Sequence, residues 1–253
     1  MLTRYQTDTR NLLQSPSAPT TLYDVTNLNL WINKARSQVA GEAECVRVLS
    51  TISTTVGLRG GYPFSSIDTG VSATNGIAGP LHVRAIRYAV GDGFQWVRPR
   101  NWEWFDLYKM NNPVPGSGPP EVWSQYGQGA IPISGGAGQG GRFFIDPIPD
   151  IIYVLTCDCV CFPIDLVNDA TVEAIPFMWT EAVSFLAAYF ALMSAQTGAR
   201  YGDAERLYQH YETFMERARK QANPSVNRYL YSQALDPTLT NKLGLQPKAA
   251  GTG

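Results

Sequence analysis

The amino-acid sequence predicts an α+β fold in which N- and C-terminal helices form a helical bundle, a β-domain is inserted between them, and an extended arm follows. Three observations support this prediction. Residues 1–45 and 164–222 carry apolar residues at helical spacing, and residues 46–163 combine β-branched runs with frequent glycine and proline. Residues 223–253 show neither pattern. We therefore expect the two ends of the chain to meet in one helical domain.

The most apolar stretch, residues 176–222, predicts two helices joined by a tight turn. The first helix is apolar on nearly every side, and we expect protein rather than lipid to enclose it because Glu181 interrupts the run. Trp179 and Phe190 are its predicted core residues. The second helix is amphipathic, and Asp203 is its predicted N-cap.

Two further helices and six strands are expected before this pair of helices. Helical spacing predicts a helix over residues 2–13 and a second one that Asp24 or Thr26 caps and that ends near Ala43. Runs of β-branched and aromatic residues predict strands at 46–56, 81–90, 94–97, 121–126, 143–145 and 151–162. The turn sequence Gly-Asp-Gly at 91–93 would join the second and third strands into a hairpin.

The composition narrows the class of protein. The chain has 253 residues, with 20 basic and 21 acidic side chains and a net charge of −1. This balance excludes the clustered basic surface that neutralises nucleic-acid phosphates. The polar start of the sequence is unlike a secretory signal, and four cysteines in so long a chain do not make a disulfide framework. We expect synthesis in a reducing cytoplasm and no membrane association.

Cys157, Cys159 and Cys161 alternate along the last predicted strand and are the most obvious candidates for metal ligands. Alternate residues of a strand lie about 6.5–7 Å apart. Thiolates bound to one zinc ion lie under about 4 Å apart, so an extended strand cannot chelate in this way. The same separation is at the outer limit for a disulfide. The sequence therefore predicts no metal and no cofactor here, and three thiols that pack as small apolar groups.

Residues 136–141, Gly-Ala-Gly-Gln-Gly-Gly, superficially match a phosphate-binding loop. Such a loop leads from a strand into a helix, whose N–H groups then point at the phosphate. Here a strand follows from Arg142, and no Gly-Lys-Ser/Thr is present. We expect a hairpin tip instead.

The two histidines, His82 and His210, fall on a predicted strand and a predicted helix. Neither lies at a recognised motif spacing from a nucleophile or a carboxylate, and the sequence contains no G-x-S-x-G or H-E-x-x-H. Distant residues can still converge in a fold, so an active site is disfavoured rather than excluded.

Trp96, Trp102, Trp104 and Phe105 form a dense aromatic group. Such residues pack a small β-domain or an interface more often than they stack sugars, and we favour the packing interpretation. The sugar-stacking interpretation remains as the alternative.

The C-terminal residues 223–253 carry tyrosine and leucine among polar residues without a sustained amphipathic period. Such a segment cannot bury enough apolar surface alone to offset its ordering entropy, but it can do so along a neighbouring protein. We expect a docking arm with aromatic anchors and with cations that pair with acidic groups. Its predicted binding residues are Arg228, Tyr229, Tyr231, Leu235, Leu239, Lys242 and Leu243.

Several stretches, taken in order, resemble one family. They are LWINKAR at 30–36, DPIPDIIY at 146–153, FPIDL at 162–166, IPFMWTEAV at 175–183 and YETFMERAR at 211–219. This order resembles the head-to-tail adaptor, or connector, proteins of short-tailed bacteriophages. The similarity covers the two ends of the chain, whereas the segment 57–141 departs from it.

The resemblance implies a non-enzymatic virion protein of the neck, made in the host cytoplasm. It implies a twelve-membered ring of this chain that joins the portal protein to the tail nozzle protein and extends the DNA channel, with DNA only as transiting cargo. The arm at 223–253 would then bind the portal. It also implies a helical bundle with an inserted β-domain. The alternative is a carbohydrate-binding or hydrolytic virion tail protein that uses the tryptophan-rich strands with Glu103 and Asp106.

Overall fold

A computed structural model describes residues 1–14, 23–68, 75–110, 116–129, 140–194 and 200–222 of the chain. The helices are α1 (Leu2–Leu12), α2 (Val25–Ala43), α3 (Trp102–Phe105), α4 (Thr180–Ser194) and α5 (Tyr201–Ala222), with short helical turns η1 (Phe64–Ser66), η2 (Asp106–Met110) and η3 (Phe177–Trp179). The strands are β1 (Arg47–Ser53), β2 (Tyr62–Pro63), β3 (Ile77–Val90), β4 (Gly93–Pro99), β5 (Val122–Tyr126), β6 (Arg142–Asp146) and β7 (Val154–Pro163).

These strands form one curled, mixed sheet in the order β1-β7-β3-β4-β5-β6-β2. The β4–β5 pair is parallel and the other pairs are antiparallel. On the enclosed side of the central pair, Ile86 lies opposite Cys157 and Tyr88 opposite Leu155, and all four are buried. Each of the six predicted strands overlaps an observed one. The two-residue β2 is not predicted, because it is too short to show a period.

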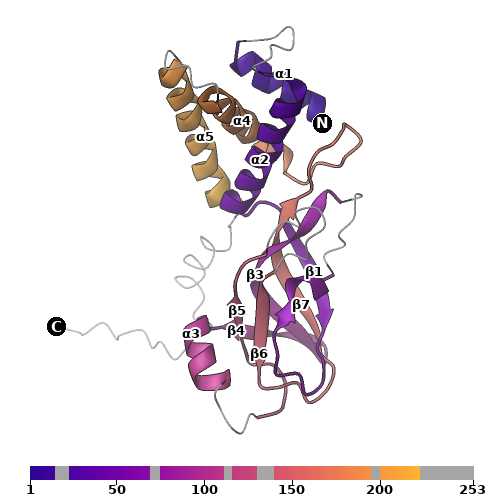
Figure 1. Ribbon diagram of the computed structural model, residues 1–253. Helices are drawn as coiled ribbons and strands as arrows, with labels where there is room; N and C mark the ends of the chain where they lie inside the picture. The colour runs from indigo at the N-terminus through magenta and orange to yellow at the C-terminus, as the bar shows by residue number, and fades with distance from the viewer. Residues whose placement is uncertain (15–22, 69–74, 111–115, 130–139, 195–199, 223–253) are drawn as a thin grey trace, which may run out of the picture.

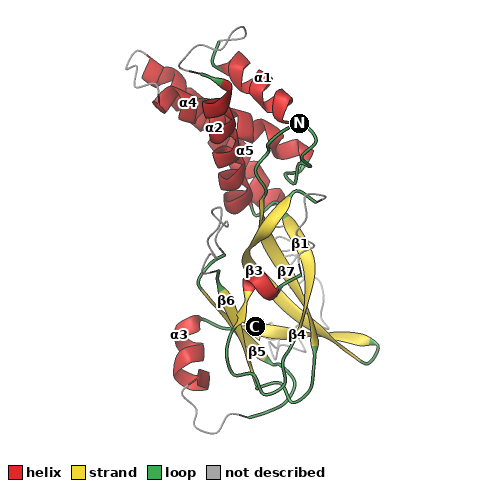
Figure 2. Ribbon diagram, turned by 45° about the vertical axis from the view of Figure 1, so that its right-hand side comes forward, coloured by secondary structure: helices red, strands yellow, loops and turns green. Residues whose placement is uncertain are grey.

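The helices α1, α2, α4 and α5 lie beyond one end of the sheet (Figures 1 and 2). The predicted cap of α2 is confirmed at Asp24, whose side chain accepts a hydrogen bond from the backbone N–H of Asn27 at 2.7 Å. α4 packs against α2 and α5. By length and composition Phe177–Ser194 could cross a membrane, but 56% of it is buried inside the protein, as in the core helix of a soluble protein.

The prediction of a helical bundle carrying an inserted β-domain is wrong. The class is α+β, but the main body is the curled seven-stranded sheet, and the terminal helices are an addition at one of its ends. The glycine- and proline-rich composition of residues 57–141 suggested a loop-rich insertion. Instead, the long strands β3 and β7 pair along most of their length, and their buried side chains belong to one hydrophobic core that continues into the helices. The boundaries proposed at 45/46, 163/164 and 222/223 stay predictions.

Two expectations about the helices also need correction. Phe190 is only partly buried, with the Nζ of Lys34 4.4 Å from its ring centre, although Trp179 is buried as predicted. The neighbouring helices instead pack against small buried residues of α4, because small side chains permit a close approach. These residues are Ala182, Ala187, Ala188 and Ala191. Asp203 does not cap α5, since the helix already begins at Tyr201 and Asp203 lies in its first turn.

Candidate docking surfaces

The seven predicted portal-binding residues of the segment 223–253 lie outside the described residues. Their role therefore stays a prediction. The described chain reaches Ala222 at the end of α5, beside the junction between helices and sheet. A cavity of about 150 Å³ at this junction is lined by Glu44, Cys45, Arg47, Pro176, Met178, Trp179 and Gln221.

The three cysteines of β7 are fully buried, which confirms that they pack as core side chains. Burial raises the pKa of Cys157 and of Cys161 to about 12, and it raises that of Cys159 as well. The thiols are therefore protonated at neutral pH and are poor ligands or nucleophiles. Among the described residues, no three His, Cys, Asp or Glu side chains are grouped so that they could hold a metal ion.

The glycine-rich segment lies mostly outside the described residues, which resume at Gly140. The strand β6 follows from Arg142, as expected, and not the helix that a phosphate-binding loop needs. Gly141 packs tightly: a Cβ there would lie 2.8 Å from the Phe64 ring and 2.9 Å from the carbonyl oxygen of Gly127.

The two histidines lie in separate parts of the molecule. His82 on β3 has its Nε2 3.5 Å from Glu44, and its partial burial lowers its pKa. His210 on α5 stacks on Phe185 of α4, with ring centres 5.3 Å apart. The fold does not bring them together into one site.

The aromatic group divides into packed and exposed members. Phe105 is buried, and Trp102 lies 4.7 Å from Phe144 and 4.9 Å from Tyr126 between ring centres. This confirms the packing interpretation for these two residues, because α3 is fixed to the sheet through them. Trp104 is half-buried, whereas Trp96 is 59% exposed and belongs to a different surface.

That surface is the outer face of the strands β1, β7, β3 and β4. Directly paired residues share a face, and one row across the sheet is Thr51, Thr156, Arg87 and Trp96. Large apolar side chains stand on the same face in this row and in the adjoining rows. Leu49, Phe94, Trp96 and Val154 are all between 56% and 65% exposed. We call Leu49, Arg87, Phe94, Trp96 and Val154 the outer face.

Arg87 lies at the centre of the outer face. Its guanidinium carbon is 4.3 Å from the ring centre of Phe94 and 5.7 Å from that of Trp96. Its Nε is buried and has no hydrogen-bond partner in the part of the chain that the structure describes. The outer face therefore offers a cation that has no ion pair with a carboxylate among the described residues.

A second exposed segment lies just before β7, at the end of the sheet away from the helices. Ile151 and Ile152 are 57% and 66% exposed. Asp150 beside them accepts hydrogen bonds at Oδ1 from the Tyr153 hydroxyl at 2.6 Å and from the Ile151 N–H at 3.1 Å. The Tyr153 hydrogen bond lowers the pKa of Asp150, which is thus ionised at neutral pH. We call residues 150–152 the acidic tip.

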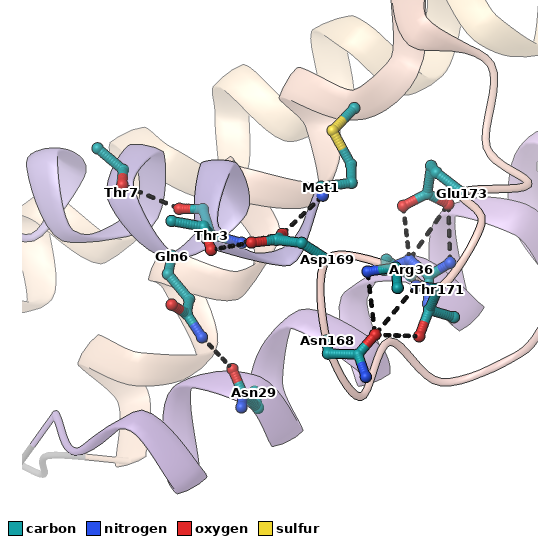
Figure 3. A network of polar contacts seen from close by, with 11 residues as sticks. Met1, Thr3, Gln6, Thr7, Asn29, Arg36, Asn168, Asp169, Thr171 and Glu173 are labelled. Atoms are coloured by element: carbon teal, nitrogen blue, oxygen red, sulfur yellow. Dashed lines mark hydrogen bonds and ion pairs between the residues drawn. The ribbon is translucent and has the colours of Figure 1, made fainter.

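A polar network fastens the loop 164–175 to the helices (Figure 3). Arg36 on α2 is fully buried and pairs with Glu173 at 2.7 Å, and its Nη1 donates to the carbonyl oxygen of Ile164 at 2.6 Å. Asn33 donates to the carbonyl oxygen of Leu166 and accepts from the Leu166 N–H. The network is structural: it links α2 to the chain that leaves the sheet.

The loop is also held by α1. The terminal ammonium group of Met1 lies 2.6 Å from Asp169, and the N–H and hydroxyl of Thr3 donate to the same carboxylate. The network thus joins the stretches at 30–36 and 162–166, which carry the resemblance noted in the sequence.

The sequence model of one protein family, described as SU10 adaptor protein, matches residues 2–237. This chain belongs to the SU10 adaptor protein family. The match spans the helices at both ends and the whole sheet, and it confirms the resemblance to phage head-to-tail adaptors. A comparison with curated proteins gives no match.

As a member of this family, the adaptor is a structural component of the phage virion, located at the neck, and it interacts with other head or tail proteins. Such a protein acts through surfaces. Sequence reasoning missed both the outer face and the acidic tip. The alternation in β1 and β7 predicts two faces but does not say which one stays uncovered. The pair Ile151-Ile152 was assigned to the strand that begins only at Val154.

Proposed function

We propose that twelve copies of this adaptor form a ring that joins the portal protein to the tail nozzle protein and extends the DNA channel. The family match over residues 2–237 carries the proposal. The arrangement of the subunit supports the proposal, because α1, α2, α4 and α5 form one end of the molecule, which we call the helical end, and the sheet forms the other (Figure 1). A subunit of this kind can contact a different partner at each end.

The segment 223–253 is the proposed portal contact. It follows α5, which ends at Ala222 beside the junction of helices and sheet. We propose that this adaptor has no catalytic role and that DNA only passes through its ring. The near balance of 20 basic and 21 acidic residues suits a channel along which DNA must slide without sticking.

The test is electron microscopy of the full-length adaptor mixed with purified portal rings. We expect a second ring of twelve subunits on one face of the portal. Deletion of residues 224–253 should abolish attachment while the helical content by circular dichroism is kept, whereas deletion of residues 249–253 is the matched control. Attachment of the longer deletion with parental affinity would contradict the docking role, and a ring of another number would correct the stoichiometry.

A further inference from the structure

The outer face needs an occupant with specific properties. Four large apolar side chains more than half exposed on one sheet face are unusual for a surface that stays in water. Arg87 sits among them with a buried Nε that donates to nothing in the described chain. Asp158, which lies opposite Leu49 in the adjoining row, is already paired with Arg47 of β1. A complementary surface therefore presents one carboxylate flanked by apolar groups.

The acidic tip has this chemistry. Asp150 is flanked by the exposed side chains of Ile151 and Ile152. Both of its internal hydrogen bonds end on Oδ1, so Oδ2 is left to accept from another molecule. The carboxylate is also oriented, because Tyr153 is itself fixed against Tyr88 with ring centres 5.4 Å apart.

The two surfaces lie at the same end of the sheet. The register pairs Tyr88 with Leu155 and Ser53 with Val154, which places the start of β7 beside the outward half of β3. In a closed ring, rotation about the axis keeps every group at its own height. Groups that meet across neighbouring subunits must therefore lie at one height in each subunit, and these two surfaces can satisfy that condition.

We propose that the outer face binds the acidic tip of a second copy of this chain, with Arg87 of one subunit paired to Asp150 of the next. The contact is head-to-tail and uses two different surfaces, so it repeats from subunit to subunit and gives a ring when the rotation between neighbours closes. This inference rests on the proposed ring and names the surfaces that build it. Phe94, Trp96 and Val154 surround the ion pair and exclude water from it, which strengthens the attraction.

Interchain disulfide formation in the full-length adaptor assembled on its portal tests the contact directly. The double variant Trp96→Cys/Ile151→Cys should give a ladder of dimers, trimers and larger species on a non-reducing gel after mild oxidation. Each single variant should run as a monomer. The parent chain, with three of its four cysteines fully buried, sets the background.

Charge reversal gives an independent measurement by analytical ultracentrifugation. Arg87→Asp and Asp150→Arg should each weaken self-association at least about 30-fold, since each places like charges in contact. Combining both reversals in one chain should restore most of it. The matched control is Arg142→Asp on β6, an exposed arginine on another part of the sheet, which should assemble like the parent.

The outcomes separate this inference from the proposed function. Rings in micrographs of the double cysteine variant without any ladder would overturn the contact and leave the ring standing. Dimers from Trp96→Cys alone would replace the head-to-tail contact with a symmetric one and overturn it too. If the parent chain forms no ring on the portal, both proposals fail.

Discussion

Arg36 of the helices and Arg87 of the sheet differ in how their hydrogen-bonding groups are satisfied. Arg36 is fully enclosed, and Glu173, Asn33 and the carbonyl oxygen of Ile164 accept its hydrogen bonds. Arg87 is partly buried, its guanidinium lies against two aromatic rings, and its Nε has no partner among the described residues. Arg36 therefore finds its hydrogen-bond partners within one subunit. In the contact inferred above, Arg87 finds its partner on a second subunit.

The largest expected effect follows from this contrast. Arg36→Gln should destabilise the isolated subunit by about 3–5 kcal/mol, because it leaves Glu173 buried without its cation. Arg87→Gln should cost about 1 kcal/mol or less, since only cation–π contacts at the surface are lost. Urea unfolding of both variants measures the difference. Equal losses of unfolding free energy in the two variants would contradict the structural role that we assign to Arg36 and the binding role that we assign to Arg87.

The next comparison lies inside the helical end. Leu186→Ala should cost about 2–5 kcal/mol, because Leu186 is fully buried on the side of α4 that meets its neighbours. Phe190→Ala should cost about 1–2 kcal/mol, because the ring is only partly buried and packs at the edge of the core, beside Tyr189 and Lys34. Thermal melts of the two variants decide the order. A reversed order would restore Phe190 as the core residue that the sequence pattern suggested.

A third comparison concerns the cost of adding a side chain at the two glycines that flank β3. Gly76 has a φ of +68°, and a Cβ there would lie 2.4 Å from the carbonyl oxygen of Val172. Gly76→Ala combines backbone strain with this clash and should cost about 1–3 kcal/mol. Gly91 also has a positive φ but open space around it, so Gly91→Ala should cost about 1 kcal/mol. Equal melting temperatures would show that the loop at Val172 yields easily.

The sequence predicts local structure well in this molecule, and the reasons are physical. The apolar runs that predict strands at 81–90 and 151–162 and the Asp24 cap are local patterns; each run overlaps an observed strand, and the cap is confirmed. Whether the sheet or the helices form the larger part of the fold depends on long-range strand pairing. The number of glycines and prolines between residues 57 and 141 does not predict that pairing. Phe190 fails for a related reason: a helix that is apolar all round does not reveal from which side its neighbours approach.

The candidate surfaces were harder to predict than the fold. Arg87 and Asp150 belong to no sequence motif. They stand out only in the structure, which shows which of their polar atoms have hydrogen-bond partners among the described residues. The predicted arm at 223–253 rests on composition alone and stays a prediction. What the sequence did contain was the order of short stretches around Asn33, Arg36 and Leu166. In this chain the polar network holds these stretches together.

The smallest expected effect concerns the Asp150–Tyr153 hydrogen bond at the sheet end, the exposed counterpart of the buried Arg36–Glu173 pair. The folded pKa of Asp150 is lowered, so this bond contributes stability above the unfolded value of about 3.9, and the contribution is lost as the pH falls below it. The pKa of Tyr153 is raised to about 12, so the bond persists below the unfolded value of about 10 and weakens as the pH rises toward 12.

Tyr153→Phe keeps the ring on Tyr88 and removes only the hydroxyl. It should raise the pKa of Asp150 in a carbon-detected NMR titration and lower the melting temperature slightly at pH 6, with the difference from the parent fading below about pH 4. A melting difference that is the same at pH 6 and in acid would show that the hydroxyl acts through packing and not through the charge that we assign to the acidic tip.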